Sequence, residues 1–169
     1  MKRLVFLSAA LALVLLPGCA GYQFGADKPT KLAKVTKLAV PTFKNNTLVP
    51  RIEVLVTNAL IKRLQTQGVY KIVPREEADA VLKAEIFDIQ RSQFRSELDN
   101  TLRTAEILMR LRVNFTVEDA NGMKLLNGQQ VGASEAVLDT NFQLTQTQVL
   151  ADAAERFAFQ MASQLTEGW

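Results

Sequence analysis

A regular alternation of apolar and polar residues near the middle of the chain constrains the fold more than any other feature. The apolar positions are Ala105, Ile107, Met109, Leu111, Val113, Phe115 and Val117. The residues between them are polar, with Leu108 as the single exception. Successive side chains of a strand point to opposite faces of a sheet. The pattern therefore predicts a long strand with one face on the core and the other on water.

A hairpin is expected directly after this strand. Asn121-Gly122 favours a two-residue turn in which both positions have positive φ. Residues 124–137 then form the return strand, and Asn127-Gly128 is expected to bend or bulge it. Residues 80–94 are also extended in pattern. Three strands of about 13 residues are long compared with the usual five or six, so this part of the sheet should project beyond the helices.

The segment before the long strands predicts a strand, a helix and a second strand. Residues 38–43 have the composition of a buried strand, and residues 44–47 that of a turn. Pro50 suits the first turn of a helix, and Gly68 suits its C-terminal cap. The apolar stripe between them is Ile52, Leu55, Val56, Ala59, Leu60 and Leu64. Residues 69–73 complete a βαβ unit, whose two strands should be parallel.

A second amphipathic helix is expected at the end of the chain. Its apolar residues recur at four-residue steps, at Val149, Ala153, Phe157, Met161 and Leu165. The element order is therefore β-α-β-β-β-α. The fold class is α+β, with the two helices packed on one face of a mixed, mainly antiparallel sheet of long strands. Residues 38–169 are predicted to form one domain, and residues 19–37 a polar, extended tether.

The first eighteen residues are expected to be removed. Lys2 and Arg3 precede an apolar run over residues 4–16, which is too short to span a bilayer but suits a signal peptide. Gly18 and Cys19 follow, and Cys19 is the one cysteine in the chain. This order resembles the lipobox of bacterial lipoproteins, although Pro17 departs from it. The resemblance implies cleavage before Cys19, a diacylglyceryl group on its sulfur and acylation of its amino group; an ordinary signal peptide is the alternative.

The composition argues against most kinds of chemistry. The chain has no histidine, which removes the commonest general base and metal ligand, and its one cysteine is assigned to the lipid. No phosphate-binding loop, dinucleotide fingerprint or nucleophile elbow is present in the sequence. Without Lys2 and Arg3 the count of Lys and Arg falls from 20 to 18 against 17 Asp and Glu, which is no nucleic-acid signature. A binding or structural protein without cofactor or metal is expected, and Glu76, Glu77 and Asp79 are interpreted as a solvated turn.

The order of these features resembles the LptE family of lipopolysaccharide-assembly lipoproteins. The resemblance rests on the start at residues 19–22, the strand at 38–43 with its Pro-initiated helix, residues 92–95, and residues 104–106 before the alternating strand. It implies a protein of the outer membrane, as Ala20 after the cysteine also implies. It further implies a plug inside the LptD β-barrel that helps to assemble the barrel and to place lipopolysaccharide in the outer leaflet.

The same resemblance implies a role for Arg95, which stands where the family has a basic residue implicated in lipopolysaccharide contact. Arg91 and Arg103 lie near the same hairpin and add charge. A guanidinium group matches phosphate oxygens, and lipid A is phosphorylated. The alternative is three solvated arginines on an exposed loop. The second basic position of the family has no match, because residues 140–148 contain no Lys or Arg.

Two other functions remain open from the sequence. One is a lipoprotein adaptor of another envelope assembly or secretion complex, since residues 38–47 are similar to strands of curli-secretion-type lipoproteins. The other is a periplasmic enzyme, which would need a catalytic set built without histidine or cysteine.

Overall fold

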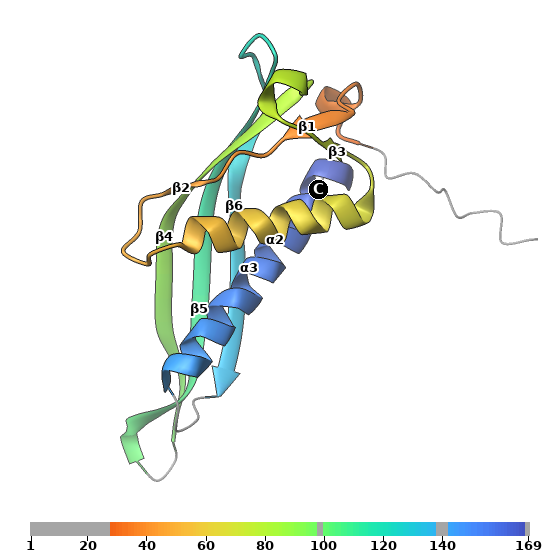
Figure 1. Ribbon diagram of the computed structural model, residues 1–169. Helices are drawn as coiled ribbons and strands as arrows, with labels where there is room; N and C mark the ends of the chain where they lie inside the picture. The colour runs from red at the N-terminus through yellow and green to blue at the C-terminus, as the bar shows by residue number, and fades with distance from the viewer. Residues whose placement is uncertain (1–27, 98–99, 138–141, 168–169) are drawn as a thin grey trace, which may run out of the picture.

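The computed structural model describes residues 28–97, 100–137 and 142–167, with side chains described outside 93–105 and 137–145. Its elements are η1 (Thr30–Leu32), β1 (Lys37–Ala39), β2 (Lys44–Asn45), α2 (Ile52–Gln67), β3 (Lys71–Ile72), η2 (Arg75–Glu77), β4 (Ala80–Glu97), β5 (Asn100–Asp119), β6 (Lys124–Val137) and α3 (Phe142–Glu167). The strand order of the six-stranded sheet is β3-β1-β4-β5-β6, and β2 pairs with β4 farther along. Both helices lie on the same face of this sheet (Figure 1), so the predicted α+β fold is confirmed.

The first strands are parallel, as predicted, but shorter than expected. β1 pairs in parallel with β3 and with the start of β4. It ends at Ala39, two residues before Pro41, which has no N–H to donate to a ladder. The chain pairs again at Lys44–Asn45, which form the parallel strand β2 beside Glu85–Ile86. The turn expected at residues 44–47 therefore begins only after Asn45, whose Oδ1 accepts hydrogen bonds from the backbone N–H and the hydroxyl of Thr47.

Helix α2 has the predicted cap and a corrected buried face. Gly68 has φ of 68° and donates its N–H to Leu64 O at 3.1 Å, as expected of a C-terminal cap. Leu55, expected in the apolar stripe, is 38% exposed, whereas Thr57 is only 3% exposed. The Thr57 hydroxyl donates to Glu53 O at 2.6 Å and accepts from Phe43 N at 3.0 Å. Burial of Thr57 thus satisfies a backbone N–H that the interrupted first strand leaves without a ladder partner.

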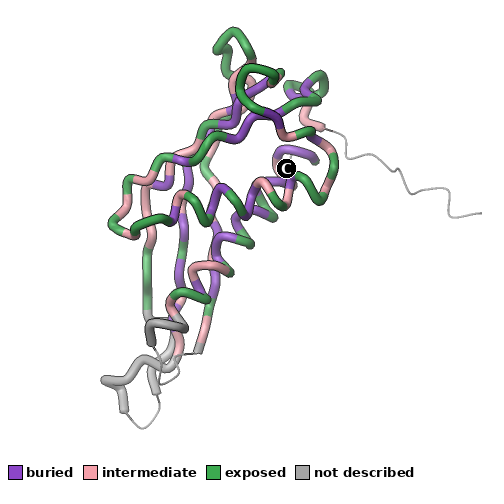
Figure 2. Tube along the Cα trace, viewed as in Figure 1, coloured by how far each residue is buried: buried purple, intermediate pink, exposed green. Residues whose placement is uncertain are grey.

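The three long strands exceed the expected length. β4, β5 and β6 contain 18, 20 and 14 residues. The β5 residues from Ile107 to Val117 alternate between buried and partly exposed positions (Figure 2). The expected bulge at Asn127-Gly128 is wrong, because both residues pair regularly with Thr116 and Phe115. The irregularity lies nearer the turn, where Leu125 is the extra residue between the pairs Val117–Leu126 and Glu118–Lys124.

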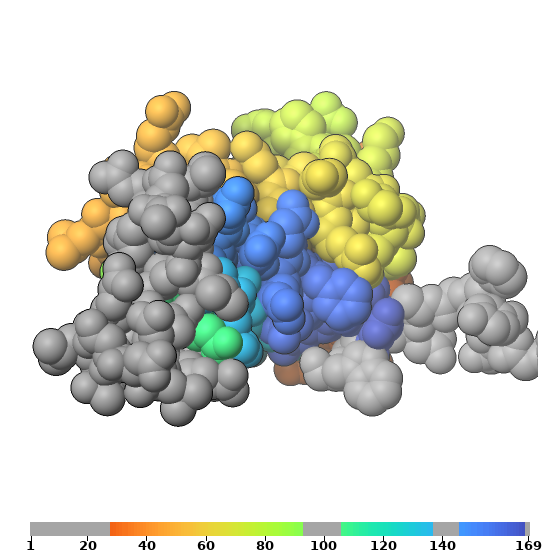
Figure 3. Space-filling model, turned by 90° about the horizontal axis from the view of Figure 1, so that it is seen from below, coloured from red at the N-terminus to blue at the C-terminus, as the bar shows by residue number. Residues whose placement is uncertain are grey.

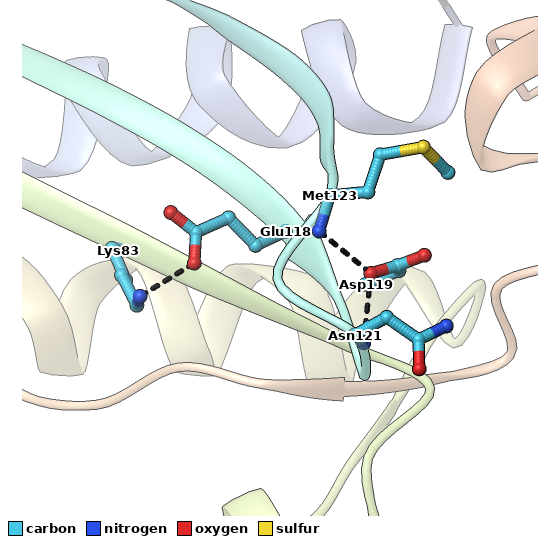
Figure 4. A network of polar contacts seen from close by, with 5 residues as sticks. All are labelled: Lys83, Glu118, Asp119, Asn121 and Met123. Atoms are coloured by element: carbon cyan, nitrogen blue, oxygen red, sulfur yellow. Dashed lines mark hydrogen bonds and ion pairs between the residues drawn. The ribbon is translucent and has the colours of Figure 1, made fainter.

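The hairpin at residues 119–124 is confirmed, but its turn differs from the expected type. Within the described chain Gly122 has φ of 82° while Asn121 does not have positive φ. Gly122 N donates to Asp119 O at 3.0 Å, and Asp119 N donates to Met123 O at 2.9 Å. The carboxylate of Asp119 also accepts from the N–H groups of Asn121 and Met123, both at 2.8 Å (Figure 4). A single glycine in the left-handed region is enough for this longer loop.

Helix α3 packs directly on β6 at Gly132. A Cβ atom at this position would lie 2.1 Å from Ala153 O and 2.6 Å from Phe157 Cβ. Phe157 is fully buried, and its ring meets that of Phe43 edge-on at a centroid distance of 6.2 Å. The absence of a side chain at Gly132 therefore lets the helix approach the sheet closely and places an aromatic contact between α3 and the first strand region.

The described end of the predicted tether packs against the fold. Leu32 and Val35 are 1% and 5% exposed. Lys28 Nζ donates to Val35 O at 2.7 Å and lies 4.5 Å from the centre of the Tyr70 ring. Residues 28–36 are therefore part of the folded body. The predicted division of the chain at residues 18, 19 and 38 stays a prediction, and residues 1–27 lie outside the described part.

Candidate functional site

The three candidate arginines lie on the hairpin formed by β4 and β5. Arg91 and Arg95 belong to β4, where they pair with Met109 and Glu106. Arg103 belongs to β5. Arg91 is exposed, whereas the side chains of Arg95 and Arg103 lie outside the described part. The topology thus brings all three backbone positions to one end of the same strand pair, and their contact with lipopolysaccharide stays a prediction. Cys19 also lies outside the described residues.

The second candidate surface is the face of the sheet opposite the helices. We call it the free face, and it comprises the outward residues Lys83, Glu85, Asp88, Arg110, Arg112, Asn114, Thr116 and Glu118 with the outward residues of β6. It follows from the alternation in β5, whose other side chains are buried beneath α3 and α2. One strand therefore supplies both a core and a polar surface.

Six charged groups on and beside the free face form three ion pairs. Lys83 Nζ lies 2.5 Å from Glu118 Oε2 (Figure 4), and Arg112 lies 3.5 Å from Asp88 Oδ2. Lys44 from β2 reaches Glu85 at 3.8 Å. The neutral side chains pair as well, since Gln129 donates to Asn114 Oδ1 at 3.2 Å.

These pairs are partly exposed, so they contribute little to stability. They make the surface polar and give it both signs of charge. A surface of this kind can approach a wet, polar wall while its paired groups keep their partners.

A shallow hollow of about 280 Å³ lies on the free face between Lys44, Lys83, Glu85 and Asn114. It contains side chains of both charges and no histidine or cysteine. Among the described residues no group of three or more His, Cys, Asp and Glu side chains is placed to hold a metal ion. The side chains of both charges suit the hollow to contact with another polar surface.

The junction where the chain enters the fold contains a polar contact that the sequence did not reveal. Asp79 Oδ2 accepts hydrogen bonds from the N–H and hydroxyl of Thr36, at 2.9 and 2.8 Å, and from Lys37 N at 2.8 Å. The backbone N–H of Lys37 and the backbone and hydroxyl groups of Thr36 hold the Asp79 pKa below its ordinary value. Asp79 is thus a structural clamp between β1 and the start of β4, and the expected solvated turn is corrected at this residue.

Tyr70 forms a second connection at the same end of the molecule. Its hydroxyl donates to Leu165 O near the end of α3 at 2.6 Å, and burial raises its pKa to about 12. Tyr70 therefore stays neutral at physiological pH and joins β3 to the last helix.

No described helix has the length and apolar composition required to cross a bilayer.

Comparison with solved structures finds a similar fold in two bacterial proteins. A lipoprotein B from Nitrosomonas europaea aligns with a TM-score of 0.54 and 14% identity over 78% of this chain and 83% of its own. A protein from Xanthomonas campestris aligns with a TM-score of 0.53 and 9% identity over 79% of this chain and 85% of its own. These identities are low, so the likeness concerns the fold alone. No curated protein matches the chain significantly in sequence.

The family comparison is more specific than the structural one. The LptE family model, described as lipopolysaccharide-assembly, matches residues 35–167. The match begins just before β1 and ends at the last residue of α3, so it includes every long strand and both helices. The chain therefore belongs to the LptE family of lipopolysaccharide-assembly lipoproteins.

Proposed function

We propose that this protein is an outer-membrane lipoprotein, anchored on the periplasmic side through acylated Cys19, that plugs an LptD-type β-barrel. In this role it helps to assemble the barrel and takes part in placing lipopolysaccharide in the outer leaflet. The family membership supports lipopolysaccharide assembly. Proteins of this family act without a cofactor and as assembly factors rather than enzymes. Their function therefore depends on the surfaces with which they bind partners.

The free face is the observation that carries the proposal. The lumen of a large outer-membrane barrel is polar and wet, so a plug needs a polar surface toward the wall. On the free face Lys83, Asp88, Arg112 and Glu118 are already paired. Contact with the wall therefore leaves these four charges with their partners, and the helices remain behind the sheet as its support.

The length of the strands fits the same role. At about 3.3 Å per residue, the 18 residues of β4 extend over roughly 60 Å. This length exceeds the roughly 30 Å hydrocarbon core of a bilayer. A plug with such strands contacts a barrel wall over its full height, while residues 91–103 lie toward one end of the β4–β5 pair.

The lipopolysaccharide part of the proposal is tested at Arg95. We expect Arg95→Ala to lower lipopolysaccharide affinity about tenfold, because a charge-assisted hydrogen bond contributes roughly 1.5–3 kcal/mol. Titration of purified protein with lipopolysaccharide at fixed salt measures the effect. Arg75→Ala is the matched control, since Arg75 is an exposed arginine in η2, outside the long strands. Equal affinities of the two variants would contradict the role of Arg95.

The anchor is tested by Cys19→Ala. This variant lacks the only thiol in the chain, and we expect it to appear in the soluble periplasmic fraction. Two or more acyl chains are needed for stable membrane attachment. Mass spectrometry of the wild-type amino terminus should show the acyl groups. An unmodified Cys19, or a variant that still fractionates with the outer membrane, would contradict the proposed anchor.

A further inference from the structure

A groove between the outer edge of β6 and one flank of α3 adjoins the free face at Gln129. Its volume is about 670 Å³. The lining side chains that matter here are Gln129, Gln130, Glu135, Arg156, Phe159 and Gln160. A second hollow of about 370 Å³ shares Gln130, Phe159 and Gln160 and extends the groove to Gln164. Seen from below, α3 lies between α2 and β6 (Figure 3), and the groove lies where α3 meets β6.

The groove is unusually rich in amide groups. Gln130 Nε2 donates to Gln160 Oε1 at 2.9 Å, which leaves further donors on both amides and the carbonyl oxygen of Gln130 for other partners. Gln164 Oε1 is buried and has no hydrogen-bond partner among the described residues. Arg63 Nε and Gln67 Oε1 are likewise buried without a partner among the described residues. Buried polar atoms are normally satisfied, so Gln164 Oε1 is an acceptor that a water molecule or another donor would satisfy.

The charge of the groove excludes an anion as its preferred ligand. The charged side chains that line the groove and its extension are Glu135, Glu167 and Arg156, so acidic groups outnumber basic ones. This charge distinguishes the groove from the β4–β5 hairpin with its three arginines. A phosphate group here would be attracted by the Arg156 guanidinium but repelled by the Glu135 carboxylate, so its net electrostatic attraction would be small.

Phe159 adds an aromatic surface to the hydrogen-bonding groups. Its side chain is 52% exposed, and the Arg63 guanidinium lies 4.7 Å from the ring centre. That contact restrains the ring, so a ligand need not immobilise it on binding. The groove thus combines a held apolar ring with amides that both donate and accept.

We propose that this groove binds a neutral glycan segment. Adjacent sugar hydroxyls donate and accept together, as amides do, and the C–H face of a sugar ring packs on an aromatic ring. An added β-strand would instead pair with the β6 backbone and leave the amide side chains without a role. The inference rests on the proposed function for the source of the glycan, which is the sugar part of lipopolysaccharide.

The position of the groove agrees with such a ligand. Arg91, Met109 and Ser134 form one cross-strand row of β4, β5 and β6. Neighbouring strands are about 4.8 Å apart, so β4 and β6 are separated by about 10 Å at this level. A phosphorylated glycolipid can therefore reach from the arginine hairpin to the groove within one molecule.

The test uses the full-length protein in detergent and a core oligosaccharide from which acyl chains and phosphates have been removed. Saturation-transfer NMR detects contact, and titration gives the affinity. We expect wild-type protein to bind saturably, and Phe159→Ala to weaken binding about tenfold and Gln160→Ala about threefold, since each loses packing or hydrogen bonds at an exposed site. Gln65→Ala is the control for Gln160→Ala, because Gln65 is an exposed glutamine of α2, and it should bind as wild type does.

Two results would overturn the glycan site: no saturable binding by wild-type protein, or equal affinities of Phe159→Ala and Gln65→Ala. Saturable binding of an uncharged strand-forming peptide in place of the oligosaccharide would also overturn it, in favour of strand addition at β6. The proposed function is tested separately, because the oligosaccharide carries no phosphate for Arg95. If intact lipopolysaccharide binds through Arg95 while the oligosaccharide does not bind, the glycan inference fails alone.

Discussion

The two faces of the same three strands differ in nearly every physical property. On the helix-covered face, Leu111, Val113 and Val117 of β5 are fully buried. On the free face, the neighbours Arg112 and Asn114 form polar contacts at the surface. Because successive residues alternate between the faces, stability and recognition are assigned to adjacent positions in the sequence. Adjacent substitutions in β5 should therefore differ sharply in their effects.

The largest expected contrast is between Leu111→Ala and Arg112→Ala. Loss of a buried leucine side chain costs about 2–5 kcal/mol, through lost burial and the cavity left behind. Loss of the partly exposed Arg112–Asp88 pair should cost less than about 1 kcal/mol. Urea unfolding of the two variants measures the free energies of unfolding. Similar losses in both variants would show that the faces do not divide as described.

Gly132→Ala tests the close contact of the covered face with α3. A methyl group would meet Ala153 O and Phe157 Cβ well inside contact distance, so the helix must move away. We expect a loss of about 2–3 kcal/mol in the free energy of unfolding. Asn127→Ala is the control on the outward side of β6, where the residue is exposed, and it should change stability by less than about 0.5 kcal/mol. A Gly132→Ala variant as stable as this control would show that α3 does not approach β6 as closely as described.

The smallest expected effect concerns the Asp79 clamp and depends on pH. Its folded pKa lies below the ordinary value of 3.8, so the ionised carboxylate stabilises the fold above that pH. This contribution is lost as the pH falls through the folded pKa. Asp79→Asn should therefore be less stable than wild type at neutral pH, and the difference should shrink as the pH falls below the ordinary value. Thermal unfolding from pH 7 to pH 2 measures this difference; a gap that does not change with pH would contradict the clamp.

Local sequence patterns predicted the elements that neighbouring residues determine, namely strand faces and helix ends. The alternation at 105–117 indicated both faces of β5, and Gly68 indicated the end of α2. Pro50 was expected in the first turn of this helix, but the helix begins at Ile52 with Arg51 as its N-cap. Other features depend on residues far apart in the sequence. The Thr57 hydroxyl is buried because Phe43 N needs an acceptor, and Asp79 acts on Thr36 and Lys37. No local pattern contains these contacts.

The candidate surfaces also divide into those that local sequence patterns indicated and those that depend on residues far apart in the sequence. The family resemblance indicated Arg95, and the polar residues of β5 indicated the free face. The groove at β6 and α3 was missed, because Gln130 and Gln160 come together only when α3 packs over Gly132. In the sequence Gly132 is only a glycine within a predicted strand, and nothing in the local pattern indicates that a helix packs against it.

The central claim is that the free face meets the wall of a β-barrel partner, and site-specific photocrosslinking in cells tests it most directly. A benzophenone amino acid is placed at Asn114 on the free face, or at Gln65 on the exposed side of α2. The account predicts a covalent adduct with the barrel protein from position 114 and a much weaker one from position 65. An adduct from position 65 with none from position 114 would contradict it.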